Sequence, residues 1–108
     1  MKILLTSLLL FTSFSSNAIT GNELFGYFQY HLDKNKAVWQ SGIYQGYVLS
    51  ISDVAEISGT ICLSGGVTNG QIYDIVGKYL KDNPETRHKN APSLVYKSLT
   101  DAYPCKKE

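Results

Sequence analysis

Two cysteines, Cys62 and Cys105, constrain this chain of 108 residues more than any other feature of its sequence. The chain opens with Lys2, an apolar run from Ile3 to Phe14 and the small residues Ser16-Asn17-Ala18, which is the pattern of a cleavable secretory leader. Exported proteins fold in an oxidising compartment, where two cysteines most simply form one disulfide. We therefore expect a Cys62–Cys105 disulfide, which anchors the C-terminus and contributes about 4 kcal/mol in the chain-entropy model.

Residues 1–18 are predicted to be removed as a signal peptide, because their apolar run is shorter than the roughly 20 residues that a membrane-spanning helix needs. Residues 19–108 then form one small domain of about 90 residues, a size that is marginally stable without a covalent tie. The ten basic and nine acidic side chains of the chain nearly balance. A nucleic-acid binder needs a basic face, so we expect no nucleic-acid partner, and no membrane association after the leader is cleaved.

Apolar residues at helical spacing predict two helices in the first half of the domain. The first is expected over residues 23–33, capped by Asn22, with a buried side formed by Leu24, Phe25, Phe28 and Leu32. The second is expected over residues 37–58, with a buried stripe formed by Trp39, Ile43, Tyr47, Ile51 and Val54. Gly42 and Gly46 lie together on the flank of this stripe. The pair indicates either close packing against another helix or an irregular, kinked helix.

Thr68 and Gln71 have the spacing of a capping box and predict the start of a third helix. That helix is expected to end at Asn83-Pro84 and to bury Ile72, Ile75, Val76, Tyr79 and Leu80. After a polar connection with room for one helical turn, Pro92 opens a last helix that buries Val95, Leu99 and Ala102. No segment alternates as a strand does. We therefore expect an all-α fold, a small single-domain bundle of four or five helices tied by one disulfide.

The chemistry of catalysis and of metal binding is poorly represented. The glycine-rich run before Thr68 lacks the lysine and the hydroxyl residue that follow the last glycine of a phosphate loop. Oxidised cysteines leave no thiol nucleophile for His31 or His88, and two histidines without paired spacing do not make a zinc site. We expect no catalytic residue, no metal and no cofactor. The eight tyrosines favour either a binding surface or a core whose edge is capped by hydroxyls.

Residues 60–105 contain an ordered set of motifs: Cys62, Gly66-Val67-Thr68, Gly70-Gln71, Val76-x-x-Tyr79-Leu80, Asn83-Pro84-Glu85, His88 and Tyr103-Pro104-Cys105. The set covers half of the mature chain and resembles the Rap/Tai family of type VI secretion amidase immunity proteins. The resemblance implies a periplasmic, all-helical inhibitor, commonly a homodimer, that binds a papain-like Cys/His peptidoglycan amidase toxin and is not itself an enzyme. Many members carry a further cysteine pair near the positions of Phe28 and Gln40, so this chain has one disulfide fewer.

The expected mode of inhibition is a rigid protruding loop or helix end that fills the amidase cleft. The candidate partner-binding residues lie in the segment that enters the third helix, on the exposed side of that helix and in the polar connection after it: Ser64, Gly65, Gly66, Val67, Thr68, Asn69, Gly70, Gln71, Tyr73, Lys78, Arg87 and His88. For Gly66, Thr68 and Gln71 the alternative is that they only hold the joint together. Gly42 and Gly46 are the candidates for dimer contact or helix packing.

Two other classes of protein stay open at this point. A small periplasmic acid-stress chaperone with one disulfide would expose apolar surface at low pH and suppress the aggregation of unrelated clients. A small cell-wall hydrolase would release fragments from isolated peptidoglycan. The ordered motifs between Cys62 and Cys105 favour the immunity protein over both.

Overall fold

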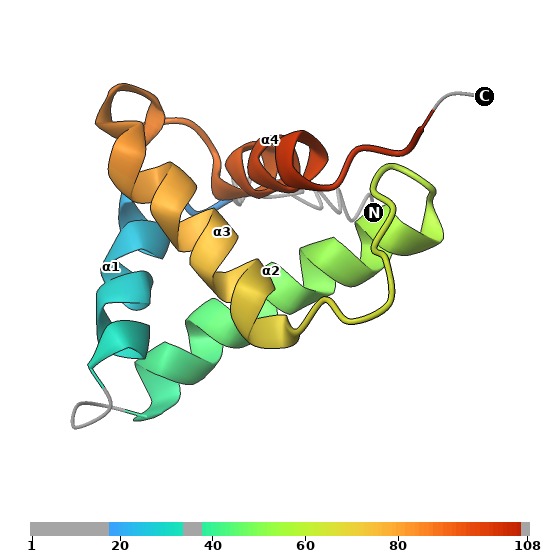
Figure 1. Cartoon of the computed structure of the whole chain (residues 1–108). Coiled ribbons are helices and arrows are strands. Elements are labelled where there is room, and N and C mark those ends of the chain that lie inside the picture. The colour runs from blue at the N-terminus through green and yellow to red at the C-terminus, as the bar shows by residue number, and fades with distance from the viewer. Residues whose placement is uncertain (1–17, 34–37, 107–108) are drawn as a thin grey trace, which may run out of the picture.

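Four α-helices and one short 3-10 helix make up the computed structural model, which describes residues 18–33 and 38–106. In chain order these are α1 (Gly21–Leu32), α2 (Val38–Ile57), α3 (Asn69–Asp82), η1 (Pro84–Thr86) and α4 (Ala91–Ala102). Figure 1 shows α3 crossing in front of α2, with α1 on one side of it and α4 on the other. The all-α prediction is confirmed. The predicted leader lies outside the described residues except for Ala18.

The first helix is capped by Thr20 rather than by Asn22, so the predicted N-cap is wrong. The Thr20 hydroxyl accepts a hydrogen bond from the Glu23 backbone N–H (3.2 Å), and the Glu23 carboxylate accepts one from the Thr20 N–H (3.4 Å). This reciprocal pair is a capping box, and Asn22 lies inside its first turn. Leu24 and Phe28 are buried as predicted, whereas Leu32, the last residue of the helix, is 56% exposed.

The buried stripe of α2 differs from the predicted one. Tyr44, Val48, Ser52 and Ala55 are buried, whereas Trp39 and Val54 are 64% and 58% exposed. The other three predicted residues, Ile43, Tyr47 and Ile51, are half-buried at the edge of the true stripe. The helix carries apolar residues on most of its circumference, so periodicity alone could not choose between two neighbouring stripes. The packing of α1, α3 and α4 against one side made that choice.

The two glycines of α2 do not pack against another element of the chain. Gly42 and Gly46 are exposed, and a Cβ built on either would meet nothing within 4 Å. The prediction of close helix packing at these positions is therefore wrong within the described chain. Close approaches occur instead at Gly77 in α3, where a Cβ would lie 2.2 Å from the Phe28 ring, and at Gly21 in α1, where it would lie 2.4 Å from the Leu94 side chain.

The second half of the chain follows its sequence signals closely. Thr68 caps α3, Asn83 ends it, and η1 supplies the single turn expected in the polar connection. The predicted apolar side of α3 faces the core, with Ile72, Val76 and Leu80 buried. In α4 Val95 and Leu99 are buried, but Ala102 is exposed because it ends the helix. Leu94 and Ser98 are buried as well, and Ser98 satisfies its hydroxyl by donating to the Val95 carbonyl (2.8 Å).

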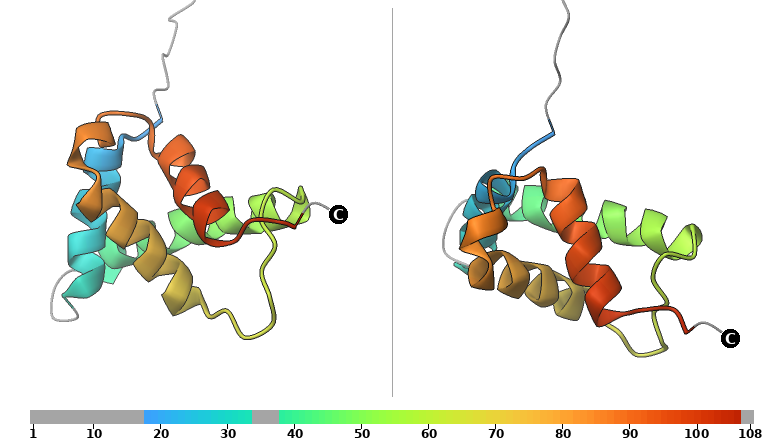
Figure 2. Two further views of the ribbon diagram at one scale, coloured as in Figure 1. Left: turned by 45° about the horizontal axis from the view of Figure 1, so that its top comes forward. Right: turned by 90° about the horizontal axis from the view of Figure 1, so that it is seen from above.

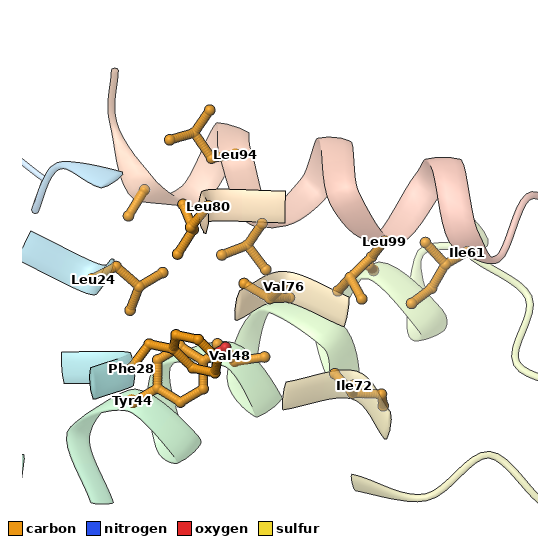
Figure 3. Close-up of a cluster of buried hydrophobic side chains, with 13 residues drawn as sticks. Leu24, Phe28, Tyr44, Val48, Ile61, Ile72, Val76, Leu80, Leu94 and Leu99 are labelled. Carbon is orange, nitrogen blue, oxygen red and sulfur yellow. The ribbon is translucent and has the colours of Figure 1, made fainter. Parts of the chain in front are cut away.

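All four helices contribute side chains to the core shown in Figure 3. Phe28 and Tyr44 lie at one end of the cluster, with ring centroids 5.2 Å apart, and Ile61 lies at the other end. Two isolated backbone bridges pin irregular segments to this body, Thr20 to Asn90 and Ile61 to Pro104. Cys62 and Cys105 form the predicted disulfide across a sequence separation of 43. Among the described helices none is long and apolar enough to cross a membrane.

Candidate functional site

The connection between α2 and α3 leaves the helical body as an exposed loop, visible in both views of Figure 2. Gly59, with φ +76°, lies two residues after the end of α2 and turns the chain toward Ile61, whose side chain is buried. Beyond Cys62 the residues Ser64, Gly65 and Gly66 are exposed, and Gly66 has φ +98°, which favours glycine. The Val67 N–H donates to the Ser64 carbonyl (3.3 Å), so these residues form a tight turn at the tip of the loop.

The far end of the loop is fixed by the start of α3. The Gln71 backbone N–H donates to the Thr68 hydroxyl (3.1 Å), and the Thr68 N–H donates to the Gln71 side-chain oxygen (2.7 Å). The predicted capping box is therefore confirmed, and it commits the polar groups of both side chains to the joint. Asn69 and Gly70 lie between them on the exposed first turn.

The near end of the loop is fixed to the C-terminal tail. Cys62 donates its N–H to the Tyr103 carbonyl (3.0 Å) and bonds covalently to Cys105. A loop that is tied at both ends loses little further entropy when a partner orders it. The segment Ser64 to Gln71 is thus preorganised, and it is exposed except at the half-buried Val67.

Tyr73 lies on the side of α3 that faces α1 and α2. Its ring stands edge-on to His31, with centroids 5.1 Å apart, and its carbonyl accepts a hydrogen bond from the Tyr44 hydroxyl (2.5 Å). His31 in turn bonds the Gln45 side chain through Nδ1 (3.1 Å). Burial raises the pKa of both Tyr44 and Tyr73 above the ordinary 10.0, which extends the pH range in which these hydroxyls are protonated upward. Tyr73 therefore joins the three helices, and only part of its ring is open to a partner.

Lys78 lies on another side of α3, at the lip of a shallow groove between α3 and α4. The groove has a volume of about 290 Å³ and an apolar lining from Ile75, Tyr79 and Ala102. Its two lips carry ion pairs within single helices, Lys78 to Asp82 at 2.5 Å and Lys97 to Asp101 at 3.1 Å. The α4 lip was not among the predicted site residues, although the i, i+4 spacing of Lys97 and Asp101 is typical of an exposed helix face.

Arg87 and His88 lie at the opposite end of α3 from the loop. The Arg87 guanidinium sits 4.3 Å from the centroid of the Phe25 ring, and the Arg87 carbonyl accepts from the Asn22 N–H (2.8 Å). Arg87 therefore attaches the connection before α4 to the start of α1, while His88 is exposed. The 14 residues of α3 place the two ends roughly 20 Å apart. The structure thus divides the predicted site residues among the loop, two sides of α3 and its far end.

The model of one known family, the Rap1a immunity proteins, matches residues 20–105. The chain belongs to the Rap1a immunity protein family. The match spans the four helices, the loop and both bonded cysteines, so the fold of this immunity protein is accounted for as a whole. No curated protein matches the chain. Membership of this family indicates an immunity protein that acts on a secreted effector as a non-catalytic inhibitor.

The cysteines and the candidate metal ligands of the Rap1a-family chain can be located directly in the structure. Both of its cysteines are in the disulfide, so neither is a free thiol. Across residues 18–33 and 38–106, no three His, Cys, Asp or Glu side chains gather as they would around a metal ion. The exposed features of the fold are the loop, the groove beside Lys78 and the apolar outer side of α2.

Proposed function

We propose that this protein is exported to the periplasm, where it binds and inhibits a type VI secretion amidase that cleaves peptidoglycan. Family membership supports an effector as the partner. The amidase, the type VI machine and the compartment rest on the resemblance of residues 60–105 and on the leader-like N-terminus. The observation that carries the proposal is the exposed loop of residues 62–68, fixed at one end by a disulfide and at the other by a capping box.

The loop inhibits by occupying space. Ser64, Gly65 and Gly66 have small side chains at the tip, so the backbone there can enter a cleft that is narrow enough to hold a stem peptide. A papain-like amidase needs its substrate carbonyl beside the catalytic cysteine, and a loop seated in the cleft denies that position without any chemistry of its own. Because both ends of the loop are fixed, little of the binding free energy is spent on ordering it.

The start of α3 and its outward side extend the proposed contact surface beyond the loop. Asn69, Gly70 and Lys78 are exposed and lie along one helix that begins where the loop ends. Tyr73 and Arg87 are half-buried and hold α3 and the following connection to α1. Substitutions at those two positions would alter the scaffold, so they test the surface less cleanly than changes at Ser64 or Lys78.

A homodimer through the outer side of α2 is the second part of the proposal. Trp39, Val54 and Ile57 are exposed along this side, and Gly42 and Gly46 leave open space between them. Burying such residues against a second copy removes apolar surface from water, and the glycines let two helices approach closely. The Gly46→Leu variant should be monomeric by analytical ultracentrifugation, whereas Gly26→Leu, an open glycine in α1, should leave the dimer intact. A Gly46→Leu protein that stays dimeric would remove this interface.

The direct test of function is inhibition of a panel of purified type VI amidases by the oxidised mature protein, with peptidoglycan cleavage as the readout. We expect stoichiometric inhibition of at least one amidase. Ser64→Trp, at the loop tip, should weaken that inhibition at least tenfold by steric conflict, about 1.4 kcal/mol. Gln29→Trp on exposed α1 is the matched control and should inhibit normally. A folded protein that inhibits no amidase in the panel would contradict the proposal and return weight to the chaperone alternative.

A further inference from the structure

The loop and the C-terminal tail hold one another at the edge of the fold. Cys62 bonds to Cys105 and donates its N–H to the Tyr103 carbonyl, and Ile61 pairs with Pro104 as an isolated bridge. Neither segment belongs to a helix, since α2 ends at Ile57 and α4 at Ala102. The attachment between them thus consists of one covalent bond, a single bridge and the buried side chain of Ile61.

Between Cys62 and Thr68 the loop has little other attachment. Its backbone makes one hydrogen bond, from the Val67 N–H to the Ser64 carbonyl, and that bond is internal to the turn. Leu63 and Val67 are half-buried against the core edge, while the three residues between them are exposed. The covalent bond is therefore the strongest constraint on where the tip of this loop lies.

The helical body does not share this dependence. The core side chains of α1, α2, α3 and α4 form one cluster, and Ile61, which precedes Cys62 in the sequence, lies at one end of it. Cys62 is exposed, so a reductant can approach the bond without unfolding the core. Cleavage at this edge acts on the loop first, because locally exposed segments with few buried contacts open at lower free energy than the core.

We propose that the Cys62–Cys105 disulfide is a redox switch for partner binding: reduction frees the loop from the tail and abolishes effector binding while the four helices stay folded. The loss of effector binding rests on the proposed function, whereas the release of the loop rests on the structure alone. In the reaction a dithiol reductant attacks one sulfur as the thiolate and forms a mixed disulfide. Its second thiol then displaces the protein sulfur, which leaves two cysteine thiols and an oxidised, disulfide-bonded reductant.

One contact partly opposes the release. The Cys105 Sγ lies 3.3 Å from the Gly59 carbonyl. A disulfide sulfur carries no hydrogen, so in the oxidised protein this is a van der Waals contact. After reduction the thiol can donate a weak hydrogen bond to that carbonyl. Such a bond keeps the tail near α2 but does not hold Cys62, so the loop is still released.

The switch ties activity to the compartment. Thiol-reducing systems keep cysteines reduced in the cytosol, whereas disulfides persist in exported proteins. A newly made chain would therefore not bind its effector before export and would become competent on oxidation. The exposed position of the bond suits this role, because oxidation can complete after the helices have formed.

The test compares three forms of the mature protein: oxidised, reduced by a dithiol, and reduced then rebridged with one methylene group between the two sulfurs. The methylene bridge restores the tie but resists a dithiol, so it separates the constraint from the thiol chemistry. Readouts are far-ultraviolet circular dichroism, amide exchange at Cys62 and Val67 compared with Val76 and Leu80, and affinity for an amidase that the oxidised protein inhibits.

We expect reduction to leave helix content unchanged, to speed exchange at Cys62 and Val67 at least tenfold while Val76 and Leu80 stay protected, and to weaken affinity at least tenfold. The methylene-bridged form should behave as the oxidised one. Loss of the helices on reduction, or unchanged exchange at Cys62 and Val67, would overturn the switch. Release of the loop without any change in affinity would overturn the claim that the disulfide controls effector binding. If the oxidised protein inhibits no amidase, the proposed function is wrong. The exchange rates at Cys62 and Val67 still show whether reduction releases the loop.

Discussion

The two ends of the core are stabilised in different ways. At one end Phe28, Tyr44 and His31 pack ring against ring, and the Tyr44 hydroxyl closes the cluster by donating to the Tyr73 carbonyl. At the other end Ile61 is the last core residue, and beyond it a disulfide and one bridge hold the loop to the tail. The aromatic end is held by several ring contacts and a hydrogen bond, and the disulfide end by one covalent bond, one backbone bridge and the buried side chain of Ile61. The proposed contact with the effector lies at the end that packs least, where an exposed segment is available to bind.

The contrast also bears on the cysteine pair that many relatives carry near Phe28 and Gln40. In this chain Phe28 is buried beside Tyr44 and against the Cα of Gly77. Aromatic packing thus occupies the region where the resemblance places a second disulfide. We infer that the packing of buried aromatic side chains, rather than a second disulfide, holds α1 and α2 together here.

Phe28→Ala should be the most damaging change at the aromatic end. It removes a buried ring and leaves a cavity between α1, α2 and α3, which should lower the free energy of unfolding by about 3 to 5 kcal/mol. Phe25→Ala is the matched control, because Phe25 is half-buried under Arg87 at the surface. Urea denaturation measures both. If the two variants lose similar stability, the aromatic end is not the main source of rigidity.

Gly77→Ala should destabilise the same cluster by overpacking it. The new methyl group would lie 2.2 Å from the Phe28 ring, so the ring or α3 must shift, at a cost of about 1 to 3 kcal/mol. Gly26→Ala in α1 has open space and should instead gain up to about 1 kcal/mol of helix propensity. Thermal unfolding of both variants gives the comparison. A stabilised Gly77→Ala protein would mean that the close approach of Phe28 is not required.

Tyr44→Phe should cost about 0.5 to 1.5 kcal/mol at neutral pH through its lost hydrogen bond. Burial, and to a lesser extent Asp74, raises the pKa of Tyr44 above its ordinary 10.0. Above pH 10 the unfolded chain therefore binds fewer protons than the folded one, and stability falls as pH rises. The variant lacks this contribution, so its stability should fall less steeply, by up to about 1.4 kcal/mol per pH unit. Equal slopes for the two proteins would contradict burial of the hydroxyl.

Thr68→Ala should cost about 1 kcal/mol of stability, because it removes the side-chain N-cap of α3. The same substitution at Thr20, the N-cap of α1, is the stability control. The two should differ in function, since only Thr68 sets the angle at which the loop enters α3. We expect Thr68→Ala alone to weaken inhibition of the partner amidase. Equal inhibition by both variants would show that the loop needs no cap.

Local signals in the sequence predicted the second half of the chain well. The spacing of Thr68 and Gln71, the stop at Asn83-Pro84 and the pairing of two cysteines each depend on residues close in sequence or on a simple count. The N-cap of α1 was predictable too, because Glu23 follows Thr20 by three positions, but Asn22 is also a good cap residue and competed with it.

The aromatic end could not be predicted in the same way. Which stripe of α2 is buried depends on the neighbours that it packs against, and Trp39 is as apolar as the residues that are buried. The candidate site had the same limit. The loop was recognised from its own residues, whereas the positions of Tyr73 toward α1 and Arg87 against Phe25 depend on tertiary packing that no local pattern contains.

The most direct test of the account is amide hydrogen exchange of the oxidised protein alone and in complex with the amidase that it inhibits. If the loop is the inhibitory surface, the amides of residues 62–68 and of the first turn of α3 should exchange more slowly in the complex than in the free protein. The aromatic cluster around Phe28 and Tyr44 should exchange as it does in the free protein. Protection confined to the far end of α3 around His88, with no change in the loop, would contradict the loop as the inhibitory surface.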